Sequence, residues 1–280
     1  MSGDAKVWVG SETGRLETVV VHAPGPEIEN MTPSNAERAL YSDILNLRPA
    51  REEHAQLRGV LERWCEVLEV GDLLREVLEV PAARAELLDR ICQNEQVPGL
   101  CEQLMELPAD PLARGLVEGV LLRKDTLTAY LSGDRYALRP LHNLFFMRDT
   151  SVVLGGRPLI ARMANRIRER EAFIMDAVYR HHPAFGVETI LPDRREGAVT
   201  IEGGDVIVAR EDLILVGQGS RTSTQAVDLL VERLLETRDH FDVVVQELPF
   251  EPESFIHLDM VFTFLDQDAC LVYEPVIMRP

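Results

Sequence analysis

Glu202-Gly-Gly-Asp205 is the middle one of three short polar phrases that decide how this sequence is interpreted. The first phrase is Asn143-Leu-Phe-Phe-Met-Arg-Asp149, and the third is His257-Leu-Asp259. The acid that ends the first phrase precedes Glu202 by 53 residues, and Glu202 precedes the histidine of the third by 55. The similar spacing, with an apolar segment after each phrase, indicates a unit that repeats along the chain.

Each apolar segment has the pattern of a hairpin, and the first two are followed by the pattern of a helix. The expected hairpins cover 151–160, 206–216 and 260–273, and the expected helices run over about 165–180 and 222–235. A unit of about 53 residues that mixes hairpin and helix has to bury its faces against its neighbours. The sequence therefore predicts an α/β fold built from packed repeats.

The remaining sequence predicts three regions. Residues 15–23 have strand character, and a helix is expected from about Pro49. Residues 71–136 contain short apolar clusters at helical spacing, separated by prolines, and predict an inserted helical bundle. The expected organisation is a first unit over 1–70, the helical domain over 71–136, and further units over 137–280, the last of them truncated. The apolar stripe expected to bury the helix after Pro49 is Leu57, Val60, Leu61, Trp64 and Leu68.

Composition excludes several classes of function. The formal net charge of −18 disfavours nucleic acid and anionic membranes as partners, because both bind positive surfaces. The N-terminus has no signal-peptide pattern, and no run of residues has the length of a membrane span. The four cysteines form no CxxC pair, so we expect a cytoplasmic protein with reduced and mostly buried thiols, without a disulfide framework or zinc site.

The three phrases supply acids and one histidine. Asp149, Glu202 and Asp259 are suited to attract a guanidinium or amine group, and Glu202 could transfer protons if burial raises its pKa. His257 and Asp259 alternate on an apparent strand, which would point both side chains the same way. Each residue also has a purely structural explanation, as a turn residue, a Gly-Gly bulge or a core histidine. A metal site is disfavoured because too few ligands are evident.

Two arginines follow the acids at a shared distance. Arg168 lies 19 residues after Asp149, and Arg221 lies 19 residues after Glu202. An arginine fork suits a carboxylate, and Asn143 could assist it. Acids at one end and arginines at the other predict a site for a zwitterionic basic amino acid, for which free arginine fits best.

The ordered set of phrases resembles the arginine deiminase family of guanidine-modifying enzymes, over nearly all of the chain. The resemblance implies a pentein-type, pseudo-fivefold α/β propeller of ββαβ units, of which about four would be present here. The segments that carry it are Ser11-Glu-Thr-Gly-Arg-Leu16, Val20-Val-His-Ala-Pro-Gly25, Asn143-Leu-Phe-Phe-Met-Arg-Asp149, Arg168-Glu-Arg-Glu171, His182-Pro183, Glu202-Gly-Gly-Asp205, Arg221-Thr-Ser223 and His257-Leu-Asp-Met-Val-Phe262.

The resemblance also implies roles. Asp149 and Asp259 would grip the guanidinium of L-arginine, and Glu202 and His257 would transfer protons. The substrate-binding residues would be Asn143, Arg168, Arg221 and Asp205. No cofactor and no metal are implied. The family's cysteine nucleophile lies in a fifth unit, where its attack leads to a thiouronium and then to citrulline and ammonia.

No nucleophile is expected in this chain, and two positions depart from the family pattern. Met147 replaces a small hydroxyl residue, and Thr150-Ser151 replaces Pro-Phe. The chain alone is therefore predicted to be inactive. The alternatives are an amidinotransferase, in which an amine replaces water, and a non-catalytic pseudoenzyme that binds arginine or a partner. An incomplete fan would expose an edge at which a missing C-terminal segment or a second copy, giving a homo-oligomer, could bind.

Overall fold

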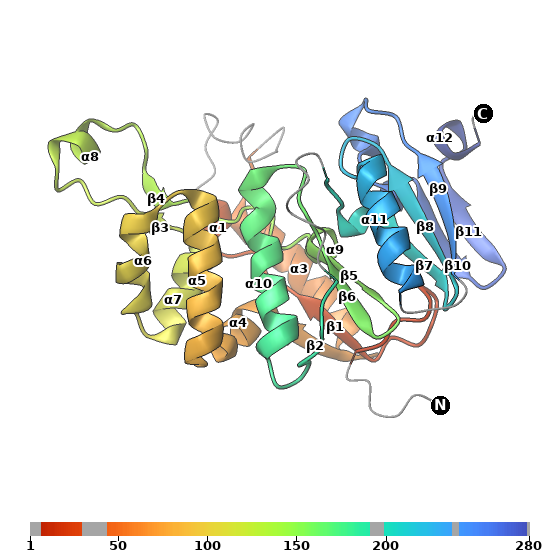
Figure 1. The fold of residues 1–280 in the computed structure, drawn as a ribbon, viewed down its shortest axis with the longest axis horizontal. Helices are drawn as coiled ribbons and strands as arrows, with labels where there is room; N and C mark the ends of the chain where they lie inside the picture. The colour runs from red at the N-terminus through yellow and green to blue at the C-terminus, as the bar shows by residue number, and fades with distance from the viewer. Residues whose placement is uncertain (1–6, 30–43, 191–198, 237–240, 279–280) are drawn as a thin grey trace. The chain divides into compact units, whose positions relative to one another are not determined.

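The computed structural model describes residues 7–29, 44–190, 199–236 and 241–278, and its elements are labelled in Figure 1. The chain divides into two compact units, Leu16–Met147 and the combination of Met1–Arg15 with Arg148–Pro280. The predicted domain boundaries at 70 and 136 were placed by the sequence repeat, whereas these two units are defined by compactness. The predicted boundaries therefore stay a prediction. Among the described residues, no helix is both long enough and apolar enough to span a bilayer.

The unit Leu16–Met147 begins with a parallel pair of strands and continues as a set of short helices. Strands β1 and β2 pair in parallel, with Thr18 opposite Glu66. The short helices predicted over 71–136 are present, and Pro81 and Pro98 lie in the first turns of α5 and α6, where proline is favoured. The elements are β1 (Thr18–Val21), α1 (Pro26–Glu29), α3 (Leu47–Leu61), β2 (Glu66–Glu69), α4 (Val70–Leu78), α5 (Pro81–Glu95), α6 (Pro98–Met105), α7 (Ala109–Glu118), β3 (Val120–Leu121), α8 (Leu127–Leu131) and β4 (Tyr136–Leu138).

Helix α3 differs from its prediction. It begins at Leu47, two residues before Pro49, and the Asn46 side chain caps it by accepting from the Arg48 backbone N–H. The predicted buried stripe is wrong. Leu57, Val60 and Trp64 are 55%, 56% and 77% exposed, and Trp64 lies beyond the end of the helix. The helix itself was predicted correctly from the apolar spacing. Among the described residues, however, only Leu47 of α3 is buried, so the predicted apolar face buries little surface.

A buried histidine joins three segments of this unit. His22 follows β1, and its Nε2 lies 3.1 Å from Oε1 of Glu27 on α1. Its Nδ1 lies 3.1 Å from Oε1 of Glu69, at the end of β2. Burial alone would lower the pKa of His22, but the hydrogen bonds and charges of the two glutamates raise it to about 9. The imidazolium therefore links α1 to both strands at neutral pH.

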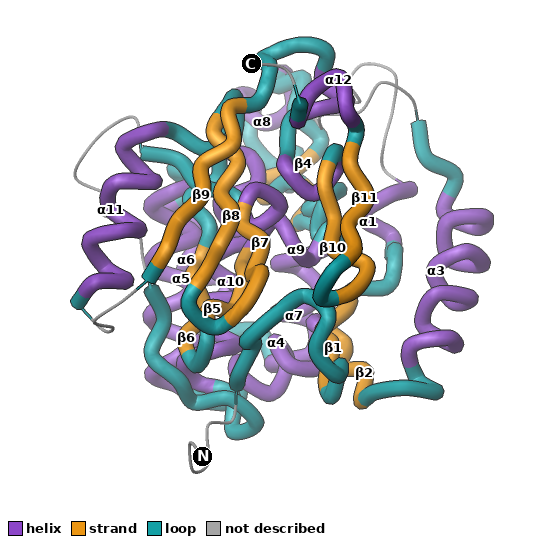
Figure 2. Tube along the Cα trace, turned by 90° about the vertical axis from the view of Figure 1, so that its right-hand side faces the viewer, coloured by secondary structure: helices purple, strands orange, loops and turns teal. Residues whose placement is uncertain are grey.

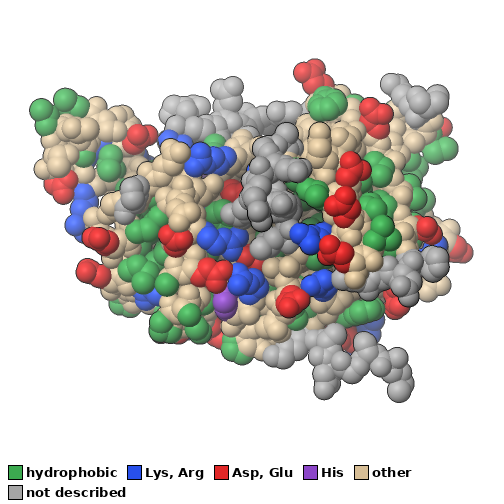
Figure 3. Space-filling view, in the orientation of Figure 1, with side chains coloured by type: hydrophobic (Ala, Val, Ile, Leu, Met, Phe, Trp, Pro, Cys, Tyr) green, Lys and Arg blue, Asp and Glu red, His purple; other side chains and the backbone are tan. Residues whose placement is uncertain are grey.

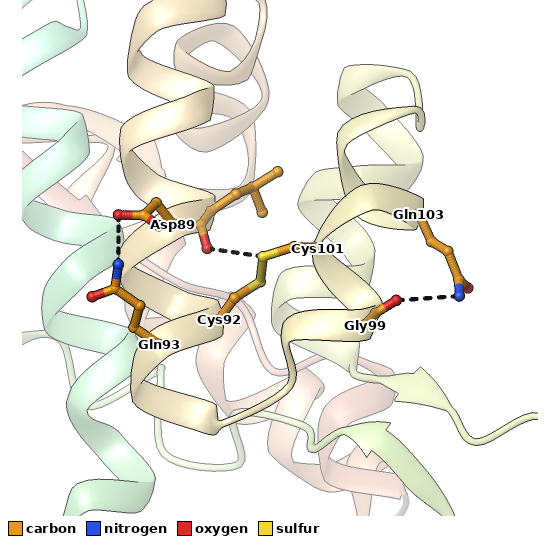
Figure 4. Close-up of a disulfide and its surroundings, with 7 residues drawn as sticks. Asp89, Cys92, Gln93, Gly99, Cys101 and Gln103 are labelled. Carbon is orange, nitrogen blue, oxygen red and sulfur yellow. Dashed lines mark hydrogen bonds between the residues drawn. A yellow bond between two sulfur atoms is a disulfide. The ribbon is translucent and has the colours of Figure 1, made fainter.

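Cys92 and Cys101 form a disulfide between α5 and α6 (Figure 4). The expectation of four reduced thiols is therefore wrong. The two residues are 9 apart in sequence, but the chain reverses through Gln96, which has the positive φ of 59°. This turn brings their Cα atoms to 6.1 Å. Of the free cysteines, Cys65 is half-buried and Cys270 is exposed, so the expectation of mostly buried thiols is also wrong.

The second unit contains the predicted hairpins. Strands β5 and β6 pair antiparallel around a turn at Gly155, which takes the positive φ of 59°. Figure 2 shows β7, β8 and β9 side by side; β7 and β8 are antiparallel, and β8 and β9 are parallel, with α11 between them in the chain. The elements are α9 (Met147–Thr150), β5 (Ser151–Leu154), β6 (Arg157–Ile160), α10 (Glu169–His181), β7 (Val206–Arg210), β8 (Leu213–Gln218), α11 (Thr224–Leu235), β9 (Asp242–Glu247), β10 (Phe262–Asp266), β11 (Ala269–Val272) and α12 (Glu274–Ile277).

Helix α11 has one buried face and one acidic face. Apolar side chains at steps of one, three and four pack into the core that β5 to β8 share. Figure 3 shows acidic side chains gathered over α11, in accord with the charge of −18. The buried residues of α11 are Ala226, Val227, Leu230 and Leu234, and the exposed acids are Asp228, Glu232 and Glu236.

The three polar phrases share one local structure. Each ends in a helical turn just before a hairpin: Met147–Thr150 before β5, Gly203–Asp205 before β7, and Leu258–Met260 before β10. The strand expected at 257–259 is therefore wrong, and the alternative explanation of Gly203-Gly204 as a hairpin bulge does not apply, because both segments form 3-10 turns. His257 is extended, but the Val261 N–H donates to the Leu258 carbonyl and closes a 3-10 turn. The turn, rather than strand alternation, sets the direction of the side chains.

Candidate active site

Asp149, Glu202 and His257, one from each phrase, meet in the second unit. The His257 Nε2 atom lies 2.9 Å from Oε2 of Glu202, and its Nδ1 lies 3.7 Å from Oδ1 of Asp149. Their side chains are buried, with 13% of Asp149, 6% of His257 and none of Glu202 exposed. The repeat thus brings residues more than 50 positions apart in the sequence to one point.

Glu202 is held from several sides. Its Oε1 atom accepts a hydrogen bond of 2.9 Å from the Ala164 backbone N–H, and Nη1 of Arg221 lies 3.9 Å from the same oxygen. Burial would raise the pKa of Glu202, but the hydrogen bond to His257 and the charges of His257, Arg168 and Arg221 lower it. The condition stated for proton transfer by Glu202, a pKa raised by burial, is therefore not met, because its charged partners outweigh desolvation.

The pKa of His257 is shifted in the opposite direction, above its ordinary value. Burial would lower its pKa, but the hydrogen bond to Glu202 and the charges of Asp149, Asp205 and Glu202 raise it. The structure therefore favours an ionised Glu202 beside a protonated imidazole. A proton bound at Nδ1 faces the Asp149 carboxylate, and a proton at Nε2 faces Glu202.

Arg168 is enclosed by acids. Its Nη1 donates to Oδ2 of Asp149 at 2.6 Å, and its Nη2 and Nε donate to Oε2 of Glu171 at 2.8 and 3.1 Å. Burial would lower the pKa of Arg168, but the charges and hydrogen bonds of the two acids raise it. The guanidinium predicted to bind a substrate carboxylate thus already binds two carboxylates of the protein, and it orients Asp149.

Asp205 is a connecting residue in this structure. Its Oδ2 accepts from the Thr222 hydroxyl at 2.6 Å, and its Oδ1 accepts from the Leu258 N–H at 3.0 Å. Burial raises its pKa to about 7, although the charge of His257 and the two hydrogen bonds oppose the rise. Each of its oxygens thus accepts a hydrogen bond from the protein, and the predicted substrate contact of Asp205 stays a prediction. Asp205 ties the residue after Arg221 to the turn that carries His257.

Gly204 lets the remaining acid approach the imidazole. A Cβ atom there would lie 2.8 Å from Cγ and Nδ1 of His257 and 3.2 Å from Oδ2 of Asp259. The Asp259 carboxylate therefore lies near the Nδ1 side of the ring, across the glycine. Burial raises the pKa of Asp259, and the positive charge of His257 opposes this. The lack of a side chain at Gly204 is therefore needed for His257 and Asp259 to pack against this position.

The structure places most, but not all, of the predicted residues in this cluster. Asn143 belongs to the other unit, where its carbonyl accepts from the Phe146 N–H in a turn. Glu171 and Thr222 were not predicted as site residues, although both lie within segments that resemble the family, 168–171 and 221–223. Arg148 and Glu12 were also not predicted as site residues, although they lie within the segments 143–149 and 11–16 that resemble the family.

Asp149, Glu202 and His257 also offer three ligand atoms within 4.8 Å of one another. Such a spacing could accommodate a metal ion. Each carboxylate is, however, already paired with the imidazole, and Asp149 is also paired with Arg168. The charges are therefore balanced among the protein's own groups, and we assign no metal to them.

Several solved structures share this fold. An amidinotransferase of saxitoxin biosynthesis from Microseira wollei has a TM-score of 0.56 at 14% identity, covering 95% of this chain and 69% of that chain. The N-terminal domain of a cyanobacterial arginine dihydrolase, solved with its substrate, has a TM-score of 0.54 at 15% identity, covering 92% and 67%. A dimethylarginine dimethylaminohydrolase from Pseudomonas aeruginosa, complexed with citrulline, has a TM-score of 0.50 at 16% identity, covering 91% and 69%. The fold is therefore the α/β pentein fold; the pseudo-fivefold propeller and the count of about four units stay predictions.

The sequence comparisons are more specific than the fold. A profile of the family described as arginine deiminase matches residues 37–280. The arginine deiminases of Staphylococcus aureus strains JH9 and Newman are each 33% identical over 291 residues, covering 98% of this chain and 70% of the relative. The chain belongs to the arginine deiminase family, whose hydrolases act on carbon–nitrogen bonds.

Proposed function

We propose that this chain binds L-arginine and supplies the guanidinium-binding and proton-transfer groups for its hydrolysis to L-citrulline and ammonia. The observation that carries the proposal is the buried contact of His257 with Glu202 at 2.9 Å and with Asp149 at 3.7 Å. Such acids suit a planar cation with several N–H donors, because a desolvated carboxylate binds such donors strongly. The family membership supports the same substrate class.

The roles follow from which atoms are occupied. The Asp149 Oδ2 atom is taken by Arg168, which leaves Oδ1, beside His257 Nδ1, for a guanidinium N–H. Asp259, on the same side of the imidazole, is the second proposed guanidinium ligand. Arg221 approaches one oxygen of Glu202 only at 3.9 Å and is the arginine we propose for the substrate carboxylate.

The proposed reaction begins when a cysteine thiolate attacks the guanidinium carbon. Ammonia leaves with a proton that His257 donates, and the thiouronium remains. Water then attacks this intermediate, and His257 takes one of its protons. The carbon–sulfur bond breaks to give a free thiolate, and the remaining hydroxyl proton leaves to solvent, where the released ammonia takes it up as ammonium, so that neutral citrulline is the product. Glu202 stabilises the imidazolium through both steps, because its lowered pKa keeps it ionised beside the ring.

The described residues of the second unit supply no thiolate to this cluster. Cys270 is exposed on β11, opposite Phe264, and is not among the ligand atoms that gather with His257. Cys65 belongs to the other unit. We therefore propose that the 280 residues alone bind arginine without turnover. Steady release of ammonia and citrulline by the purified chain would contradict this part of the proposal.

Isothermal titration calorimetry tests the site. We expect L-arginine to bind, L-citrulline to bind more weakly because its urea group is neutral, and agmatine to bind more weakly because it lacks the carboxylate. Asp149→Asn should weaken L-arginine binding by about 10- to 100-fold, the loss of one charge-assisted hydrogen bond. Asp228→Asn, on the exposed face of α11, is the matched control and should leave the affinity unchanged.

Two results would contradict the binding assignment. One is the absence of binding heat at about 10 mM L-arginine. The affinity would then be weaker than a site with several charge-assisted hydrogen bonds should have. The other is an Asp149→Asn chain that binds as well as the Asp228→Asn control.

A non-catalytic arginine-binding protein is the second candidate function. The exposure of Cys270 favours it, because a nucleophile has to reach the bound guanidinium. Rapid quenching with labelled arginine separates the two. A covalent adduct on a cysteine supports an enzyme, whereas tight binding without an adduct supports the binding protein. If added amines appear as amidinated products, the chemistry is amidino transfer instead.

A further inference from the structure

Glu12 and Arg148 form a two-pronged ion pair beside the cluster. Arg148 Nη2 donates to Oε1 of Glu12 at 2.7 Å, and Nη1 donates to Oε2 at 3.1 Å. The Glu12 Oε1 atom also accepts from the Val208 N–H at 3.0 Å, and the Glu12 N–H donates to the Val208 carbonyl at 2.8 Å. Glu12 therefore joins Arg148 to β7.

Arg148 also binds the segment that follows Glu202. Its Nε donates to the Gly203 carbonyl at 3.2 Å, and Nη2 donates to the Val206 carbonyl at 2.7 Å. The backbone makes the same approach, because a Cβ at Gly203 would lie 2.1 Å from the Arg148 carbonyl oxygen. The two residues in contact here are the immediate neighbours of Asp149 and Glu202.

The two charges of the pair act on the pKa of Asp259 in opposite directions. The positive charge of Arg148 lowers the pKa of Asp259, and the negative charge of Glu12 raises it. The partners thus oppose each other in their effect on a neighbouring carboxylate. The effect of the pair on geometry remains, because five side-chain hydrogen bonds and one backbone hydrogen bond join the N-terminal segment, α9 and the Gly203–Val208 segment.

We propose that Glu12 and Arg148 are a positioning pair that fixes the distance of Asp149 from the Glu202–His257 pair. The inference rests on the proposed function for its meaning, but its geometry is independent of any ligand. Without the pair, the turn that carries Asp149 loses its side-chain ties to the segment that follows Glu202. Asp149 then moves away from the imidazole, and the guanidinium site opens.

The test compares variants that distinguish position from charge. Arg148→Gln removes a positive charge, which by electrostatics alone would raise the pKa of His257. Loss of the positioning pair instead takes Asp149 away from the ring and lowers that pKa. Proton–carbon NMR of histidine-labelled, ligand-free chain reads the pKa directly. Glu188→Gln, which breaks the exposed ion pair with Arg157, is the matched control.

The expected results are a lowered His257 pKa in Arg148→Gln and in Glu12→Gln, and an unchanged pKa in Glu188→Gln. The double variant should resemble either single variant, because both remove one shared contact. L-arginine should bind about tenfold more weakly to each site variant. The melting temperature should fall little, because a partly exposed ion pair contributes little to global stability.

A His257 pKa that rises or stays constant in Arg148→Gln would overturn the inference. If the wild-type chain binds no arginine but the pKa falls in the variant, the proposed function fails and the positioning role stands. If Arg148→Gln does not fold, Arg148→Lys replaces it. Lysine keeps the charge but cannot make the two-pronged contact, so a normal His257 pKa in that variant would equally overturn the inference.

Discussion

Glu202→Gln should destabilise the chain in a way that depends on pH. The substitution keeps the size of the side chain and removes the charge that faces His257 at 2.9 Å. A hydrogen bond to a charged group contributes about 1.5–3 kcal/mol, so we expect the free energy of unfolding to fall by about 2–3 kcal/mol near pH 5.5. The pKa of His257 should fall, because the hydrogen bond and the charge of Glu202 are among the causes that raise it.

The pH dependence of this stabilisation follows from the pKa shifts of Glu202 and His257. Glu202 has a pKa below its ordinary 4.5, so its contribution is present above 4.5 and is lost as the pH falls through the folded value. His257 has a pKa above its ordinary 6.5, so its contribution is present below 6.5 and is lost as the pH rises through the folded value. The full effect of the pair therefore lies between about pH 4.5 and 6.5.

Urea denaturation followed by circular dichroism measures this difference at pH 5.5, 7.5 and 9.5. Glutamine can still accept from a neutral imidazole, so the wild-type advantage should shrink at pH 9.5. Asp212→Asn, in an exposed ion pair with Arg210, is the control and should change stability by less than about 1 kcal/mol. A loss in Glu202→Gln that is equal at all three pH values would refute the reasoning.

Three further predictions concern other parts of the structure. Gly203→Ala should lower the free energy of unfolding by about 3 kcal/mol, because the new Cβ meets the Arg148 carbonyl at 2.1 Å. Gly59→Ala, which has open space around it in α3, should raise the free energy of unfolding by about 1 kcal/mol. Equal effects of the two substitutions in denaturant titrations would contradict this prediction. His22 has a pKa of about 9 against an ordinary 6.5, so its contribution of about 3 kcal/mol is present below pH 6.5 and lost as the pH rises through 9. His22→Gln should remove that pH dependence, and a variant whose stability still falls over this range would show that other groups cause it. Binding of a guanidinium should leave the proton of His257 in place, because the proposed reaction needs it for the leaving ammonia, so the calorimetric enthalpy at pH 7 should be the same in phosphate and in Tris. Enthalpies that differ between the two buffers would count against this role of His257.

The order of strands and helices was predictable from the sequence where one physical signal dominated. The hairpin at 151–160 and the helix expected from about 165 are present, because apolar runs on both sides of Gly155-Gly156 indicate the hairpin and helical spacing indicates the helix. The face of α3 was predicted wrongly, since periodicity shows which side chains align but not what covers them. The pairing of Cys92 with Cys101 was missed because it depends on the turn between two helices.

The members of the site were predictable, but their roles were less so. Regular spacing identified Asp149, Glu202 and His257, because a repeated unit returns equivalent positions to one place. Spacing could not show that Arg168 already binds Asp149, or that both oxygens of Asp205 are occupied. Those facts depend on side-chain partners from neighbouring turns, which no linear pattern specifies.

The contact of Glu12 with Val208 has a consequence for synthesis on the ribosome. The two residues are 196 positions apart. At about 5–20 residues per second, the ribosome needs roughly 10–40 s to make the chain between them. During that time Glu12 has no β7 to bind, although Val9 can pair with Gly155 as soon as that residue has been made. Chaperones that hold emerging chains would therefore meet Glu12 well before the strand that binds it has been made.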